Sequence, residues 1–186
     1  MGRASIGLVS LAFLLACGGG SSVNVNTDYD PLATPKMSAY HTWNWLRVPA
    51  GTAARGDSSV QEVIERIVEA RLAARGYQKS DTNPEFRVGW HAALGEALDV
   101  TSTNAYYGYA WGRWFPGGGV VYSRGFHTQF EPGSLVLDIT DNRARELIWR
   151  GVGREVFQAK ETAASREKLV SEAITKLFAQ FPPSGK

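Results

Sequence analysis

The sequence predicts an α+β fold in two layers, with a mostly antiparallel sheet of about five strands and two helices packed on one face. Residues 133–158 are predicted to form a β-hairpin, because side chains alternate in character in steps of two on either side of a short polar turn. Residues 59–72 and 169–181 instead place apolar side chains at helical spacing. Since strands and helices do not alternate regularly, we expect both helices to lie on one face of the sheet.

The composition is that of a single globular domain. The chain has 186 residues, of which 44% are hydrophobic and 20% charged, as in ordinary globular proteins. Its 20 basic and 18 acidic residues give a net charge of +2, which argues against nucleic acid as a partner. The single cysteine excludes an internal disulfide and a cysteine-based zinc cluster.

Residues 1–16 are predicted to be a lipoprotein signal peptide. Arg3 precedes an apolar run that is too short and too poorly flanked to span a membrane. The run ends in Leu14-Leu15-Ala16-Cys17, which resembles a bacterial lipobox. The alternative is an ordinary signal peptide in which the cysteine occurs by chance.

The lipobox resemblance implies that Cys17 becomes the first mature residue and is lipidated. Its sulfur would receive a diacylglycerol and its new amino group a fatty acid such as palmitate, which together give stable anchoring. Residues 17–22, rich in Gly and Ser, form a flexible tether. Gly18 in place of aspartate indicates the outer membrane, facing the periplasm, by the sorting habit of enterobacterial lipoproteins.

The mature domain is predicted to span residues 23–182, beginning with two strands. Residues 23–29 alternate between apolar and polar side chains, and residues 40–46 are aromatic and β-branched. Pro31 and Pro35 are expected to break any regular element between the strands.

A helix should follow a small-residue loop at residues 50–57. Ser59 and Glu62 have the form of a capping box, and Gly76 occupies the position of a left-handed C-cap. The apolar stripe of this helix consists of Val60, Val63, Ile64, Ile67, Val68 and Leu72.

Residues 86–94 are expected to form a strand with one buried face, as are residues 135–140 of the hairpin. Residues 120–130 also have some strand character. Pro182 and Pro183 should end the last helix, whose apolar stripe we expect to extend to Phe181.

An aromatic and Gly-rich insertion at about residues 97–130 is the best candidate for binding. Exposed aromatic side chains generally mark an interaction site, here for a glycan, a lipid or a protein partner. The alternative is that the rings fold back onto the open face of the sheet and complete the core. The candidate binding residues are Tyr106, Tyr107, Tyr109, Trp111, Arg113 and Trp114.

Nearly the whole mature chain, residues 23–182, resembles the bacterial lipoproteins of domain-of-unknown-function family 4136. The resemblance implies a cell-envelope location and an α+β domain, and it supplies no activity and no functional residues. Residues 34–37 depart from the family pattern locally. The matching motifs are Asp28-Tyr29-Asp30, Tyr40-His41-Thr42-Trp43, Ala73-Ala74-Arg75-Gly76-Tyr77, Gly133-Ser134-Leu135-Val136-Leu137-Asp138-Ile139 and Leu147-Ile148-Trp149-Arg150-Gly151.

No catalytic, metal or cofactor site is predicted. His41, His91 and His127 are far apart in sequence, whereas a metal site needs about three converging ligands. Motifs for a nucleophilic serine or a phosphate loop are absent. The carboxylates expected near strand ends, with turn or ion-pair roles, are Asp28, Asp30, Asp138 and Asp141.

Trp149 and Arg150 are adjacent in a strand and therefore point to opposite faces. We expect Trp149 in the core and Arg150 paired with a carboxylate, the alternative being ligand recognition.

These observations favour a lipid-anchored protein of the bacterial cell envelope, acting as a binding or structural module. The alternative is an envelope enzyme acting on glycan or lipid, which would need a pocket that gathers two or more of the named carboxylates and histidines. A third interpretation is a subunit of an envelope assembly that uses a sheet edge for strand addition.

Overall fold

The computed structural model describes residues 23–46, 58–94, 98–99, 126 and 129–184. The predicted signal peptide, the tether, the loop at 50–57 and most of the aromatic insertion lie outside these residues. Within the described ranges, no helix is long and apolar enough to span a bilayer.

Six strands form one mixed sheet in the order β1-β8-β7-β4-β2-β3, and a separate ladder pairs β5 with β6. The pairings among β1, β8, β7 and β4 are antiparallel, and β2 pairs in parallel with β4 and β3. The prediction of a mostly antiparallel sheet is therefore confirmed, with one strand more than expected. The strands are β1 (Asn24–Tyr29), β2 (Thr42–Trp45), β3 (Gln78–Lys79), β4 (Phe86–Ala92), β5 (Leu98–Asp99), β6 (Gln129–Phe130), β7 (Leu135–Asp141) and β8 (Glu146–Arg154).

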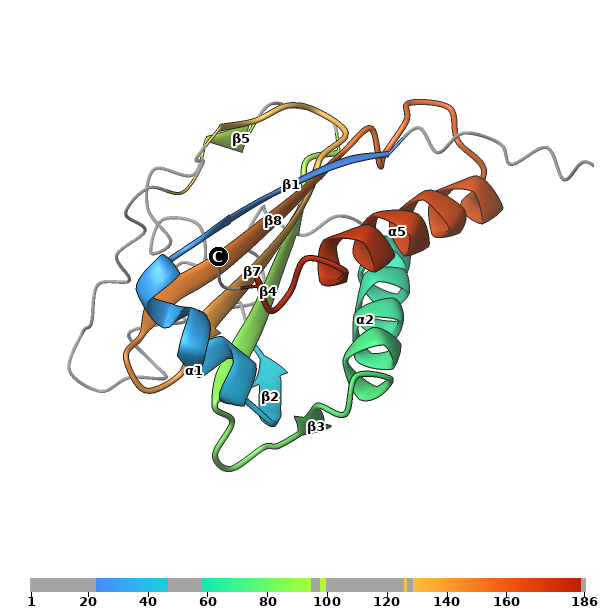
Figure 1. Cartoon of the computed structure of the whole chain (residues 1–186). Helices are drawn as coiled ribbons and strands as arrows, with labels where there is room; N and C mark the ends of the chain where they lie inside the picture. The colour runs from blue at the N-terminus through green and yellow to red at the C-terminus, as the bar shows by residue number, and fades with distance from the viewer. Residues whose placement is uncertain (1–22, 47–57, 95–97, 100–125, 127–128, 185–186) are drawn as a thin grey trace, which may run out of the picture.

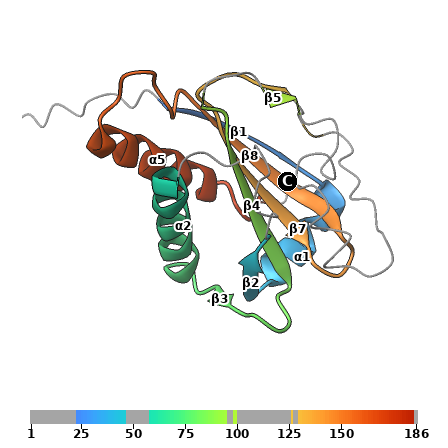
Figure 2. The ribbon, with the colours of Figure 1, turned by 180° about the vertical axis from the view of Figure 1, so that it is seen from behind.

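The two predicted helices, α2 (Ser58–Ala73) and α5 (Ala163–Phe178), lie on the same side of the sheet (Figure 1), and the view from behind shows the same arrangement (Figure 2). They also contact each other, because Arg66 of α2 bonds Glu167 of α5 at 2.7 Å. This confirms the expected two-layer α+β architecture.

The prolines at 31 and 35 begin helices, so the prediction that they break regular structure is wrong. Pro31 starts a 3-10 turn, η1 (Pro31–Ala33), and Pro35 lies in the first turn of a third helix, α1 (Thr34–Ala39). A proline is tolerated there because the first amides of a helix have no intrahelical partner. Asp30 caps η1 by accepting from the Leu32 amide at 2.9 Å, and Met37 of α1 is fully buried in the core.

Two predicted helix boundaries also need correction. α2 already includes Ser58, one residue before the position at which the sequence placed the start of the helix. α5 is capped by Thr162, whose hydroxyl accepts from the Ser165 amide, and it ends at Phe178, so Phe181 lies beyond the helix. Phe181 is nevertheless buried. The left-handed backbone of Gly76, with φ of 85°, confirms the predicted C-cap of α2.

The main hydrophobic core lies between the sheet and the helices. Alternate residues of β4 and β7 face it, and Trp149 of β8 lies within it, as predicted. Phe181 fills the space beside Trp149 and Phe86, with ring centroids 5.5 and 5.9 Å away. The apolar side chains that α2 and α5 contribute include Ile64, Val68, Leu72, Val170, Ile174 and Leu177.

The opposite face of the sheet is also buried at its centre, so the expectation of half-buried strands is wrong. All seven residues of β7 are buried, as are six of the seven in β4. β7 is flanked by strands on both sides, and on this face its side chains lie in the middle of the sheet. Polar residues on this face, among them Asp138, His91 and Thr140, are packed inside the protein.

Gly151 lets the ring of Trp149 lie against α5. A Cβ at this position would clash with Trp149 Cη2 and would lie 2.8 Å from Leu177 Cδ2. We predict that Gly151→Ala lowers the free energy of unfolding by about 1–3 kcal/mol through overpacking. The loss, measured by urea denaturation, should be smaller in a Trp149→Phe background, because the smaller ring makes room.

Gly76→Ala is the matched control, because a Cβ there meets nothing within 4 Å and only its left-handed backbone is strained. Its cost should be the same with Trp149 or Phe at position 149. Equal losses from Gly151→Ala in the two backgrounds would contradict the steric explanation.

Candidate functional site

The residues predicted to carry function lie outside the described part of the chain. These are the lipidation site Cys17 and the aromatic group Tyr106, Tyr107, Tyr109, Trp111, Arg113 and Trp114. Their roles therefore stay predictions. The described residues instead show a polar cluster on the sheet face opposite the helices, which we call the far-face cluster: Asp138, Arg150, His91 and Phe130.

An ion pair forms the centre of the far-face cluster. Arg150 of β8 lies opposite Asp138 of β7, and its Nε and Nη2 donate to the two carboxylate oxygens at 2.6 and 2.7 Å. The two side chains are 1% and 0% exposed. Such a two-pronged bond satisfies both oxygens with fixed geometry. The prediction that Arg150 pairs with a carboxylate is confirmed.

Phe130 and His91 complete the cluster. The Phe130 ring of β6 lies 5.5 Å from the Arg150 guanidinium carbon, within the range of a cation–π contact. His91 of β4 is buried, and this burial lowers its pKa to about 4. The nearby charge of Asp138 acts to raise that pKa and that of Arg150 to lower it further. At neutral pH His91 is therefore uncharged.

The chemical capacity of the far-face cluster is limited by its internal pairing. Both carboxylate oxygens of Asp138 accept hydrogen bonds from Arg150. A general base needs an oxygen that can accept a proton from a substrate, and this pairing occupies both oxygens. No sequence signal placed His91 beside this pair, because the two strands are joined by more than forty residues. The alternation of side chains in β4 and β7 shows that His91 and Asp138 lie on the same face only after the pairing of the two strands is known.

The histidines do not converge in the described structure. His41 precedes β2 at an exposed position beside Glu85, whereas His91 lies near the far end of β4. With about 3.3 Å per strand residue, they are roughly 20 Å apart. His127 lies outside the described residues. Among the residues described, no group of three metal-ligating side chains could hold an ion.

Asp141 organises the turn between β7 and β8, as predicted for a turn former. Its Oδ1 accepts from the amides of Arg143 and Ala144 at 2.8 Å each. Its Oδ2 accepts from the Tyr40 hydroxyl at 2.8 Å. Burial, followed by this hydrogen bond, raises the pKa of Tyr40. This carboxylate is therefore engaged in holding α1 against the hairpin.

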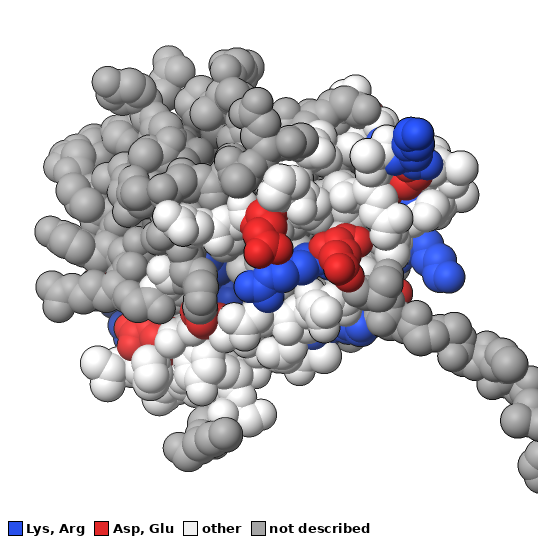
Figure 3. Space-filling view, turned by 90° about the horizontal axis from the view of Figure 1, so that it is seen from above, with Lys and Arg blue, Asp and Glu red and all other residues white. Residues whose placement is uncertain are grey.

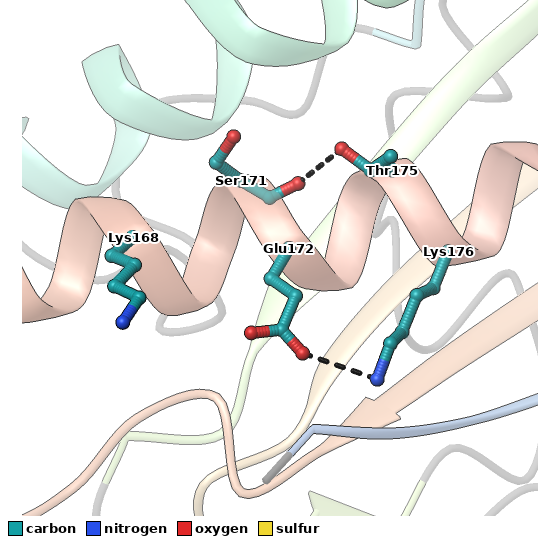
Figure 4. A pocket seen from close by; sticks show the side chains of 5 residues that line it. All are labelled: Lys168, Ser171, Glu172, Thr175 and Lys176. Atoms are coloured by element: carbon teal, nitrogen blue, oxygen red, sulfur yellow. Dashed lines mark hydrogen bonds and ion pairs between the residues drawn. The ribbon is translucent and has the colours of Figure 1, made fainter. Parts of the chain in front are cut away.

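A second feature is an open groove of about 520 Å³ along α5, which we call the α5 groove. Lys168, Glu172 and Lys176 point to the same side of the helix there (Figure 4). Lys176 and Glu172 form an ion pair at 3.1 Å, so the lining carries both signs of charge. From above, basic and acidic side chains alternate across the described surface (Figure 3). The described lining of the α5 groove is therefore not of one sign, as a site selecting an anionic ligand would be.

The fold and these sites define a small α+β domain built on a mixed sheet with a buried polar far face. The chain belongs to the family described as Domain of unknown function (DUF4136), whose sequence model matches residues 25–183. The family suggested by the sequence motifs is thus confirmed. No curated protein matches the chain.

Two solved structures are similar to the chain at low identity. A PDZ domain protein from Parabacteroides distasonis ATCC 8503 matches with a TM-score of 0.50 and 9% identity, over 87% of this chain and 36% of the other. This chain therefore spans about a third of that protein, and the likeness concerns the fold alone. A dodecamer of a PelC variant from Paraburkholderia phytofirmans matches with a TM-score of 0.37 and 10% identity, over 83% of this chain and 96% of the other.

Removing one partner of the buried ion pair should strongly lower the free energy of unfolding. We predict that Arg150→Met lowers the free energy of unfolding by about 3–5 kcal/mol, because it leaves the Asp138 carboxylate buried without its cation. The double variant Asp138→Leu/Arg150→Met should lose less, since no buried charge remains. Urea denaturation measures both.

The control is Arg66→Met, which breaks an ion pair whose side chains are 59% and 51% exposed. It should cost less than about 1 kcal/mol. If Arg150→Met cost no more than this control, the ion pair would be unimportant for stability.

His91 should make stability depend on pH. Its folded pKa of about 4 lies below the ordinary value of 6.5, so the unfolded chain binds a proton that the folded chain does not. Stability should therefore fall as pH drops from about 6.5 to about 4, by on the order of 2 to 3 kcal/mol, with little further loss from this group below that. Urea midpoints across this range measure the effect.

The His91→Gln variant should show a flatter profile between those pH values. The exposed His41 provides the matched control, and His41→Gln should keep the steeper profile of the unaltered protein. Parallel profiles for all three proteins would show that His91 does not carry the pH dependence.

Proposed function

We propose that this protein is a lipid-anchored component of the bacterial cell envelope, held through Cys17 at the periplasmic side of the outer membrane. It acts as a binding or structural module. The observation that carries the proposal is the position of the chain's only cysteine, which ends a lipobox-like leader and lies just ahead of the folded domain.

The start of the domain suits such an anchor. Val23, the first described residue, follows the six-residue tether 17–22 directly, and β1 begins at Asn24. Lys176 of α5 donates to the Val23 carbonyl at 2.7 Å, which fixes the point where the chain enters the fold. A fully extended tether of this length spans about 20 Å. The folded body would thus stay close to the membrane surface.

The described carboxylates support a module more than an enzyme. Asp138 is paired with Arg150, and Asp141 is bonded to its own turn and to Tyr40. Glu85 accepts from the amides of His41 and Thr42, and the first of these bonds is the main cause of its lowered pKa. The acceptor capacity of these groups is therefore taken up by the fold.

The enzyme alternative has one observation in its favour. Asp138 and His91 come from different strands and lie in one buried cluster, close enough for the charge of Asp138 to affect the pKa of His91. The Arg150 pairing opposes this alternative, because both carboxylate oxygens of Asp138 already accept hydrogen bonds from the guanidinium. We therefore favour a module whose interaction surface is the aromatic segment 106–115.

The anchor can be tested on the natural mature protein. We expect mass spectrometry of its N-terminal peptide to show a diacylglyceryl group and a further acyl chain on Cys17. Fractionation should place the protein with the outer membrane, and Cys17→Ser should release it. A bare thiol at Cys17, or cleavage further along the chain, would overturn the anchor.

The binding role needs a separate measurement on the same anchored protein. A variant lacking Tyr106–Gly119 should stay folded, judged by cooperative unfolding, and should lose the envelope components that the unaltered protein retains in a pull-down. Recovery of the same components by both proteins would contradict the aromatic surface. Loss of cooperative unfolding would favour the alternative in which the rings belong to the core.

A further inference from the structure

The outer edge of β1 offers backbone groups for pairing. β1 is the first strand of the six-stranded sheet, and no other described strand pairs with its outer side. The Asp30 amide donates to the Ile148 carbonyl at 2.9 Å, so even-numbered residues direct their backbone groups toward β8. In an extended strand the intervening residues direct theirs the other way. The backbone groups of Val25, Thr27 and Tyr29 therefore point outward.

The six residues of β1 include no lysine, no proline and no bulge. Natural edges are blunted by lysine, proline, bulges or very short strands. β1 has six residues, Asn-Val-Asn-Thr-Asp-Tyr, and pairs with β8 in unbroken register. The only cover among the described contacts is at its start, where Lys176 binds the Val23 carbonyl. No strand in the described part of the chain occupies the outward positions of Val25, Thr27 and Tyr29.

The sequence of β1 is complementary to itself when two copies run antiparallel about Thr27. In that register Thr27 lies opposite Thr27 of the second copy, and Val25 opposite Tyr29, a favourable pair of β-branched and aromatic side chains. On the other face Asn26 lies opposite Asp28, and Asn24 opposite Asp30. No two like charges meet, whereas a register centred on residue 28 would oppose the two Asp28 side chains.

We propose that two copies of this chain associate through β1, antiparallel and centred on Thr27, and join their two six-stranded sheets into one. The neighbouring helix is compatible with this pairing. α5 lies beside the start of β1, since its Lys176 bonds the Val23 carbonyl at 2.7 Å, and Gln180, just beyond the helix, accepts from the Thr27 hydroxyl at 2.9 Å. The α5 groove, whose Lys176 reaches the start of β1, carries both signs of charge, so it does not present a surface of one sign to a second α5. This interface goes beyond the proposed anchoring and is independent of it.

The register can be tested by cysteine cross-linking of the full chain in detergent. Two Thr27→Cys copies would face each other as a hydrogen-bonded pair, with Cα atoms roughly 5.5 Å apart, inside the disulfide range. Asn26→Cys is the matched control, because its partner position is 28, which leaves the two introduced thiols roughly 8 Å apart. We expect oxidation to give disulfide dimers of Thr27→Cys well above the level of the unaltered chain, whose only cysteine is Cys17.

Equal cross-linking of Asn26→Cys and Thr27→Cys, or none above the unaltered chain in either, would overturn the proposed register. Cooperative unfolding of both variants, measured first, ensures that the comparison concerns folded protein.

The charges give a second test that needs no covalent bond. Asn26 is exposed, so it can be changed with little effect on the fold. Asn26→Asp would place a carboxylate opposite Asp28 of the second copy, and Asn26→Lys would place an ammonium there. Sedimentation in density-matched detergent should show a dimer for the unaltered chain, a dissociation constant raised about tenfold by Asn26→Asp and one lowered by Asn26→Lys.

The difference between the two charge variants should shrink at high salt, because surface charges are screened. Identical dissociation constants for the two variants would overturn the proposal. So would an unaltered chain that stays monomeric up to about 100 μM.

Discussion

The buried ion pair between Asp138 and Arg150 determines how the strands of this sheet align. Both side chains lie inside the protein, so any other register of β7 on β8 would leave a charge buried without its partner. Moving one strand by a single residue would also exchange its two faces and turn a charge into the hydrophobic core. The pair therefore selects one arrangement of the hairpin, onto which β4 and β1 add on either side.

The helix side of the same hairpin follows from that register. With Asp138 and Arg150 on the far face, Leu137, Ile139 and Trp149 must face α2 and α5. Gly151 comes two residues after Trp149 on the same face and leaves room for the large ring against α5. The Asp138–Arg150 pair thus determines which side chains of the hairpin face the helices, and Gly151 makes room for the largest of them.

The parts that sequence predicted are those set by local periodicity. The hairpin, α2 and α5 follow from alternation and helical spacing, and the expectation that Arg150 pairs with a carboxylate came from its place on the face opposite Trp149. The burial of the far face was not predicted, because a sequence pattern cannot show that Asp138 meets Arg150 across the sheet. α1 was missed because Pro35 suits a first turn as well as a break. Cys17 and the aromatic segment lie outside the described residues and stay predictions.

The two proposals place a geometric condition on each other. In the proposed pair of copies, Val23 lies opposite Pro31 of the second copy, so the two tethers start eight residues, or roughly 26 Å, apart along the joined strands. The two-fold axis relating antiparallel edge strands is perpendicular to the sheet, and both starting points therefore lie at the same height along it. Two tethers that each span about 20 Å can then reach one bilayer only if a face of the joined sheet lies over the membrane. Anchoring and strand pairing together thus orient the domain, which neither does alone.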